Sequence, residues 1–132
     1  KQKNKEAFVI APHPFHIAHS CLGKKLEENL SVFDAIEFSW FYSKLINPNR
    51  KVMRFASKYS LPVIGNSDLH RLEELGKTYS LIDAKKDRNS IFAAIKSGKV
   101  KIVSKPLSLG KFVSIALHLI LEHLWKSIKD RI

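Results

Sequence analysis

Short apolar runs alternate with amphipathic segments along this 132-residue chain, and this alternation limits its fold more than any other feature. The runs contain mainly β-branched and aromatic residues, which is typical of strands, and they lie at 7–12, 34–38, 61–65, 78–83 and 99–104. Segments 24–33, 50–60 and 87–98 lie between them and carry apolar residues at helical spacing. Strands that alternate with helices predict an α/β fold with mainly parallel strands, in a sheet or a barrel.

The last segment, 111–132, is expected to be a long amphipathic helix. Its apolar residues recur on one stripe, at Val113, Leu117, Leu121, Leu124, Ile128 and Ile132. It falls short of the roughly 18 consecutive apolar residues that a membrane span needs. We therefore expect residues 1–110 to form the α/β part and 111–132 to pack on it. A contact with a second copy or with a membrane surface is the less favoured alternative.

The charge of the chain favours anionic partners. Lys and Arg number 23 against 12 Asp and Glu, a formal net charge of +11, which would attract phosphates, nucleic acid or anionic lipid. The lysines are spread along the chain and do not form one block. Cys21 is the only cysteine, which excludes an internal disulfide and fits a reducing compartment. No signal peptide is visible, so a cytoplasmic location is expected.

Polar residues with metal-binding chemistry follow several predicted strands. His13, Glu37, Asp68 and His70 each lie at or just beyond the carboxyl end of such a strand, where ligands gather in α/β folds. Asp68 and His70, two apart in "GNSDLH", can reach the same side of an extended backbone. Imidazole and carboxylate together suit Zn, Mn or Fe. His16 lies in the loop after His13 and is a candidate for facing a phosphate.

Five stretches of the chain resemble the second half of a PHP domain, the polymerase and histidinol phosphatase family. They are "VIAPHPF", "FDAIEF", "LPVIGNSDLH", "LGKTYSLI" and "IFAAIKSGKV", in the family's order over about residues 7–103. They are most similar to the stand-alone phosphoesterase branch. The resemblance implies part of a distorted (β/α)7 TIM-like barrel that binds two or three divalent metal ions and hydrolyses phosphate esters.

The resemblance also implies roles for individual residues. His13, Asp68 and His70 match metal ligands of the family, and Asp68 and His70 are the candidate catalytic residues. His16 and Arg71 are the candidate substrate-binding residues, because the planar guanidinium of an arginine can hold a phosphate. The expected substrates are phosphate esters such as nucleotides or the 5′-phosphate of single-stranded nucleic acid. The oligomeric state is not indicated.

One departure from the family pattern leaves two hypotheses open. The opening histidine-x-histidine motif of the family, and the ligands that follow it, have no counterpart in this sequence. We expect the residues to come from a longer protein whose first half carries those ligands. The alternative is a PHP-like nucleic-acid-binding or interaction module without catalysis. It is supported by the positive charge and by the missing ligands.

Overall fold

The computed structural model describes residues 6–16, 21–69 and 72–129, without the side chains at positions 73, 123 and 126. The chain divides into two compact units. The first comprises Lys1–Trp40 and Pro48–Lys105, and the second comprises Phe41–Asn47 and Pro106–Ile132. The first unit has the mixed α/β composition predicted from the alternating runs, and each of the five predicted strands overlaps an observed strand.

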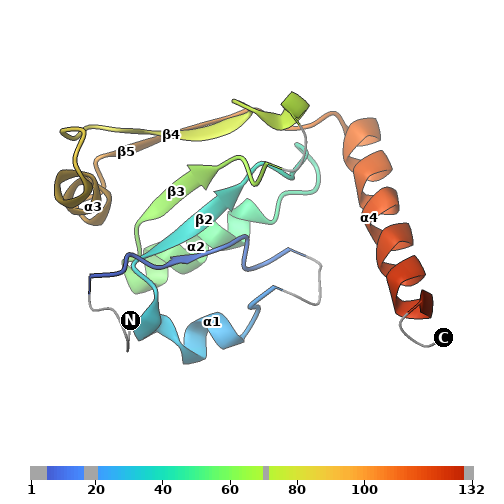
Figure 1. Ribbon diagram of the computed structural model, residues 1–132, viewed down its shortest axis with the longest axis horizontal. Coiled ribbons are helices and arrows are strands. Elements are labelled where there is room, and N and C mark those ends of the chain that lie inside the picture. Colours follow the sequence, from blue (N-terminus) through green and yellow to red (C-terminus); the bar gives the residue numbers. More distant parts are fainter. Residues whose placement is uncertain (1–5, 17–20, 70–71, 130–132) are drawn as a thin grey trace. The chain divides into compact units, whose positions relative to one another are not determined.

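Three parallel strands form the main sheet of the first unit (Figure 1). They are β1 (Ile10–Ala11), β2 (Ala35–Ser39) and β3 (Val63–Asn66), with β2 in the centre. Ala11 lies opposite Ile36, and Ile36 lies opposite Val63. Parallel pairing places the carboxyl ends of all three strands at one edge of the sheet, as predicted.

The hydrophobic core lies between this sheet and two helices, α1 (Lys25–Glu28) and α2 (Asn49–Tyr59) (Figure 1). Its fully buried members come from β1, α1, β2 and α2, and they are Ala11, Leu26, Ile36, Val52 and Ala56. The predicted apolar face of 50–60 is therefore confirmed. Ser60 ends α2 in the left-handed region, with φ of 52°. A short 3-10 turn, η1 (Leu30–Val32), connects α1 to β2.

A buried asparagine joins the start of α2 to the end of β2. The Asn49 side-chain amide donates a 2.9 Å hydrogen bond to the Ser39 carbonyl. The Ser39 N–H donates to the Asn49 side-chain oxygen, also at 2.9 Å. Both residues are 1 % exposed. Because water cannot replace these partners, the pair fixes where the helix begins relative to the strand.

The last two strands depart from the mainly parallel arrangement that was predicted. β4 (Thr78–Ile82) and β5 (Val100–Ser104) form an antiparallel ribbon, so the described strands make two sheets, and a TIM-like barrel is not shown. The helix between them, α3 (Arg88–Lys96), was the reason to expect a parallel crossover. Instead the strand pairing runs on to Asp83 and Lys99, whose backbones bond at 3.2 Å. The helix and its flanks therefore form the connection of one long hairpin.

Helix α3 confirms its predicted ends. The Asp87 carboxylate accepts the Ser90 N–H at 2.9 Å, as an N-cap residue does. Gly98 follows the helix with φ of 73°, the left-handed conformation expected after a helix end. A second 3-10 turn, η2 (Leu72–Glu74), precedes β4.

The ribbon approaches β3 closely at Gly65. The Gly65 N–H donates to the Ser80 hydroxyl at 2.7 Å, and that hydroxyl donates to the Gly65 carbonyl at 3.0 Å. A Cβ atom on Gly65 would lie 2.7 Å from Cγ2 of Ile102 and 3.1 Å from the Tyr79 carbonyl oxygen. Glycine is required here because a side chain would collide with the ribbon.

The second unit consists of segment 41–47 and the helix α4 (Leu109–Lys129) with the residues before it. Phe41 stacks on Phe112 with ring centroids 4.5 Å apart, and the Leu107 N–H donates to the Tyr42 carbonyl at 2.8 Å. The predicted terminal helix is confirmed over these bounds, and its packing on the α/β part remains a prediction. Within the described residues, no helix combines the length and hydropathy needed to cross a bilayer.

Candidate metal centre

The carboxyl edge of the main sheet brings together two of the three predicted ligands. His13 comes two residues after β1, and Asp68 comes two residues after β3. Although 55 positions separate them in the sequence, the His13 Nε2 atom lies 3.8 Å from the Asp68 Oδ2 atom. Both side chains are about one-third exposed, so the pair is accessible from solvent. The third predicted ligand, His70, and the predicted phosphate contact, Arg71, lie outside the described residues.

Both members of the pair have unusual backbone conformations. The φ angle is 22° at His13 and 43° at Asp68, values that residues with a Cβ atom rarely adopt. Such conformations persist only where the surrounding structure holds them, and they cluster at functional sites. At His13 two features hold the backbone in this conformation. Its N–H donates to a carboxylate oxygen of Glu37 at 3.0 Å, and the next residue, Pro14, is fully buried.

Glu37 is a buried acid beneath this pair. The residue is 2 % exposed, and its Oε2 atom accepts the His13 N–H. Within the described residues its Oε1 atom has no hydrogen-bond partner. Burial raises the pKa of Glu37 and the nearby Asp68 charge raises it further, whereas the His13 N–H bond and the His13 charge lower it. A buried oxygen without a partner is costly, and a cation would compensate it.

His16 is half-buried against His13. The two rings meet edge to face with centroids 5.8 Å apart. The pKa of His16 is lowered to about 4, mainly by burial and also by the His13 charge, whereas the Asp68 charge opposes the shift. At neutral pH the imidazole is therefore uncharged. It can exchange a hydrogen bond with a phosphate or donate a lone pair to a metal, but it cannot supply the positive charge of an arginine.

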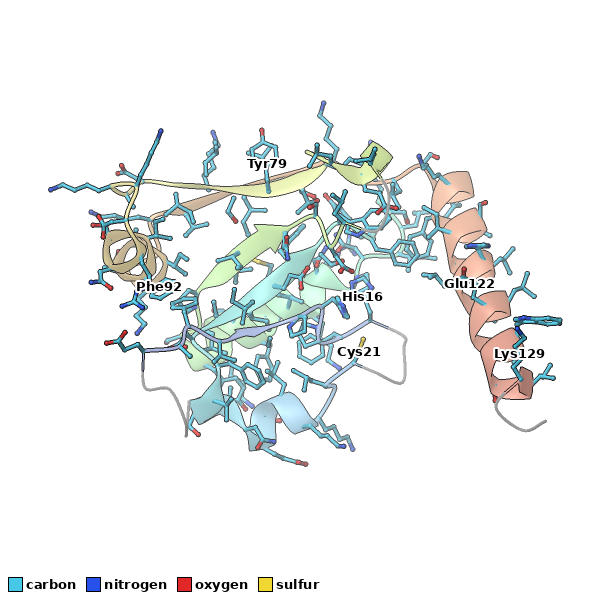
Figure 2. All side chains as sticks on the ribbon, in the orientation of Figure 1. His16, Cys21, Tyr79, Phe92, Glu122 and Lys129 are labelled. Carbon is cyan, nitrogen blue, oxygen red and sulfur yellow. The ribbon has the colours of Figure 1, made fainter. Side chains whose placement is uncertain are left out.

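Cys21 lies near the Nδ1 atom of His13, whereas Asp68 lies near the Nε2 atom. From the sequence, Cys21 was assigned no part in the site. Its Sγ atom is 3.5 Å from the His13 Nδ1 atom. Figure 2 shows Cys21 and His16 in the region that follows β1. The only sequence signal was the position of Cys21 at the end of the same loop, eight residues after His13.

The donor set fits a divalent cation. A Zn–N bond and a Zn–O bond together span about 4.2 Å, so one ion can bond both atoms of a pair that lies 3.8 Å apart. Neutral imidazole and carboxylate also suit Mn and Fe. Among the residues that the structure describes, no group of three or more His, Cys, Asp and Glu side chains is arranged to hold a metal ion. The described part therefore brings together two candidate ligands, His13 and Asp68, beside the buried carboxylate of Glu37.

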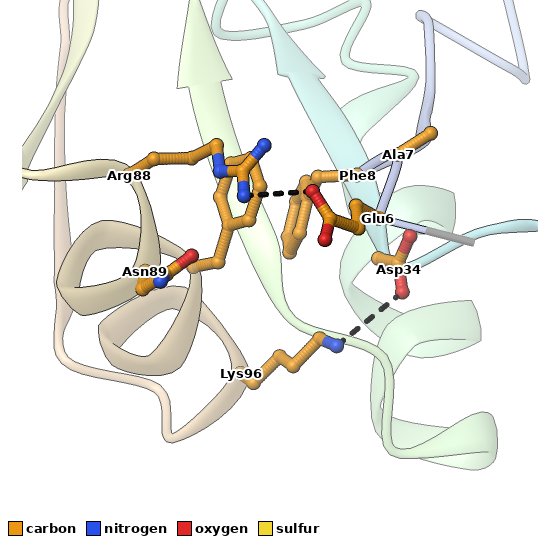
Figure 3. Close-up of a pocket in the computed structure, with 8 residues that line it drawn as sticks. Glu6, Ala7, Phe8, Asp34, Arg88, Asn89 and Lys96 are labelled. Atoms are coloured by element: carbon orange, nitrogen blue, oxygen red, sulfur yellow. Dashed lines mark hydrogen bonds and ion pairs between the residues drawn. The ribbon is translucent and has the colours of Figure 1, made fainter. Parts of the chain in front are cut away.

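A separate pocket lies where the main sheet begins, at the opposite end of the strands from His13 and Asp68 (Figure 3). It is crossed by two ion pairs, Arg88 with Glu6 at 2.9 Å and Lys96 with Asp34 at 3.7 Å. Phe8 stacks on Phe92 in its wall, with centroids 4.5 Å apart. These contacts attach α3 to the segments that precede β1 and β2, which is a structural role.

Comparison with known families supports the resemblance. A family model described as PHP-associated matches residues 47–100, from just before α2 to the first residue of β5. The matched stretch contains Asp68 and the "SDLH" motif, whereas His13 and Glu37 lie before it. None of the curated proteins matches the chain. The predicted relation to the PHP families is thereby confirmed, and this PHP-associated family is related to the PHP hydrolases.

Proposed function

We propose that this chain is part of a metal-dependent phosphoesterase that hydrolyses phosphate esters. The observation that carries the proposal is the His13–Asp68 pair, 3.8 Å apart at the carboxyl edge of a parallel sheet. The PHP-associated match over residues 47–100 supports it independently. Nucleotides or 5′-phosphorylated oligonucleotides are the proposed substrates, because the net charge of +11 favours polyanions.

The residues of this chain would divide the work as follows. His13, Asp68 and His70 would hold a Zn, Mn or Fe ion, and the Glu37 carboxylate would balance its charge from below. A bound divalent cation activates water at neutral pH and neutralises charge on the phosphate oxygens. Arg71 would grip the phosphate through its planar guanidinium, and neutral His16 would orient it through a hydrogen bond. The family's other ligands would come from a preceding part of a longer protein.

The test compares Asp68→Asn with a control that changes the charge equally, Glu28→Gln at an exposed position of α1. Both variants are made in the full-length protein, which would carry the family's other ligands. Metal content is measured after loading with Zn or Mn, and turnover is measured on a 5′-phosphorylated oligonucleotide. Losing a ligand should lower activity at least roughly 100-fold and reduce the bound metal, with the control unchanged. Full metal content and turnover in Asp68→Asn would remove this residue from the site. An unmodified protein that binds no transition metal and turns over no ester would favour the module without catalysis.

A further inference from the structure

The antiparallel ribbon has one face turned toward β3 and one turned away from it. Thr78 is 1 % exposed, Ser80 bonds Gly65, and the Ile102 side chain lies against Gly65, so the even-numbered residues face β3. Side chains alternate along a strand, and directly paired residues share a face. The opposite face is therefore formed by Lys77, Tyr79, Leu81 and Asp83 on one strand and by Lys99, Lys101, Val103 and Lys105 on the other.

This outer ribbon face is exposed and strongly basic. Tyr79 is 41 % exposed and Leu81 is 51 % exposed, and Figure 2 shows Tyr79 pointing away from β3. The face carries four lysines and one aspartate. Among the residues that the structure describes, none of these four ammonium groups is in an ion pair, and four lysines against one aspartate leave the face a net charge of +3.

The positions of the lysines around Tyr79 indicate the kind of partner. Lys99, Lys101 and Lys105 lie along β5 or directly beyond its ends, over roughly 20 Å of strand, with successive same-face positions roughly 7 Å apart. Tyr79 lies opposite Val103, between Lys101 and Lys105 on the neighbouring strand. An aromatic ring within a row of lysines can stack a base while the lysines contact the phosphates on either side.

We propose that the outer ribbon face binds single-stranded nucleic acid, with Tyr79 stacking on a base and the lysines contacting the backbone. An anionic membrane would share the attraction to lysine. It would favour a broader apolar surface than the small patch of Tyr79, Leu81 and Val103. The proposed surface contains none of the candidate metal-site residues, so it does not depend on the proposed catalysis.

The first test measures the salt dependence of binding. The ligand is an oligothymidylate with a 5′-hydroxyl end and a 3′ fluorophore, and a chelator is present so that the phosphoesterase site does not contribute. Three or four phosphate contacts predict a slope of log K against log salt of about −2 to −3. Replacing Lys99, Lys101 and Lys105 by Gln should reduce its magnitude by about 2. The matched control, with Gln at the exposed positions Lys24, Lys25 and Arg54, should change it by less than about 0.5.

The second test isolates the stacking contribution. Tyr79→Ala should weaken binding roughly 5- to 150-fold at fixed salt, whereas Tyr79→Phe, which keeps the ring, should stay within about threefold. Both Tyr79 variants are checked for correct folding by thermal unfolding. Equal binding by Tyr79→Ala and the unmodified protein, or an equal change of slope in the ribbon triple variant and the control triple variant, would overturn the proposal. Binding to vesicles of phosphatidylserine and phosphatidylcholine without binding to the oligonucleotide would also overturn it. Asp68→Asn should bind the oligonucleotide normally, which separates this proposal from the catalytic one.

Discussion

Replacing His16 by Gln should remove much of the acid sensitivity of the first unit, because the folded protein holds this imidazole uncharged. Burial and the His13 charge lower the pKa of His16 from 6.5 to about 4, against an opposing effect of Asp68. In the unfolded chain the same group titrates near its ordinary value. Between these two values the unfolded state binds a proton that the folded state does not accept.

The sign and size of the effect follow from this difference. A group with a depressed pKa costs no stability above its unfolded value of 6.5, and stability is lost as the pH falls from there toward about 4. At pH 5 the lost free energy of unfolding is about 2 kcal/mol, and the full loss below the folded pKa is about 3 kcal/mol. Small domains have total stabilities of roughly 5–15 kcal/mol, so this loss is measurable.

Glu37 acts in the opposite direction and must be separated from His16. Its pKa is raised from 4.5 mainly by burial, so its contribution is present below 4.5 and is lost as the pH rises through the folded value. Acidification therefore regains stability at Glu37 while it loses stability at His16. Comparing the unmodified protein with a His16 variant cancels the Glu37 contribution, because both proteins retain that acid.

The assay is urea unfolding at about pH 7.5 and about pH 5, with a chelator present, monitored through the fluorescence of buried Trp40. The loss of unfolding free energy between the two pH values should be about 2 kcal/mol larger in the unmodified protein than in His16→Gln. His16→Asn is the control, because it perturbs packing differently but should show the same reduced pH dependence. If both variants lose as much stability as the unmodified protein, the buried neutral imidazole is not the cause.

Three further predictions concern stability. Gly65→Ala should cost about 1–3 kcal/mol in chemical denaturation because the added Cβ collides with the ribbon, whereas Gly110→Ala, which has open space around it, should be neutral or slightly stabilising. Asn49→Asp should cost roughly 1–3 kcal/mol, since it loses the donor that satisfies the Ser39 carbonyl, and an unchanged urea midpoint would contradict this assignment. Ser60→Gly should raise stability by roughly 0.5–1 kcal/mol in the same assay because φ is 52°, and a lower midpoint would show that Ser60 is not strained.

Local patterns were sufficient to predict the elements of the fold. The apolar spacing of Val52 and Ala56 correctly gave the buried face of α2, and Asp87 correctly gave the start of α3. Strand pairing was not predictable in the same way. A helix between two strands usually implies a parallel crossover, but here β5 returns along β4. That choice depends on contacts far apart in the sequence, such as those between Gly65 and Ile102.

The candidate site was predictable only as far as strand ends could indicate it. The rule that functional groups gather at carboxyl ends brought His13 and Asp68 together correctly. It could not show that Glu37 would bond the His13 backbone, because that contact depends on how the β1 loop turns back over β2. The burial of His16 and the approach of Cys21 depend on the same loop, whose conformation has no periodic signature in the sequence.

The single hydroxyl of Ser80 has a consequence for the solubility of the first unit. It accepts a hydrogen bond from the N–H of Gly65 and donates one to the carbonyl of Gly65. On an uncovered edge strand, these two backbone groups would be free to bond a neighbouring molecule. Free backbone groups of this kind are templates for strand addition between molecules, which leads to aggregation. Because a side chain of β4 caps both groups, the backbone hydrogen bonding of the main sheet ends at this point of β3, although the ribbon lies beside it.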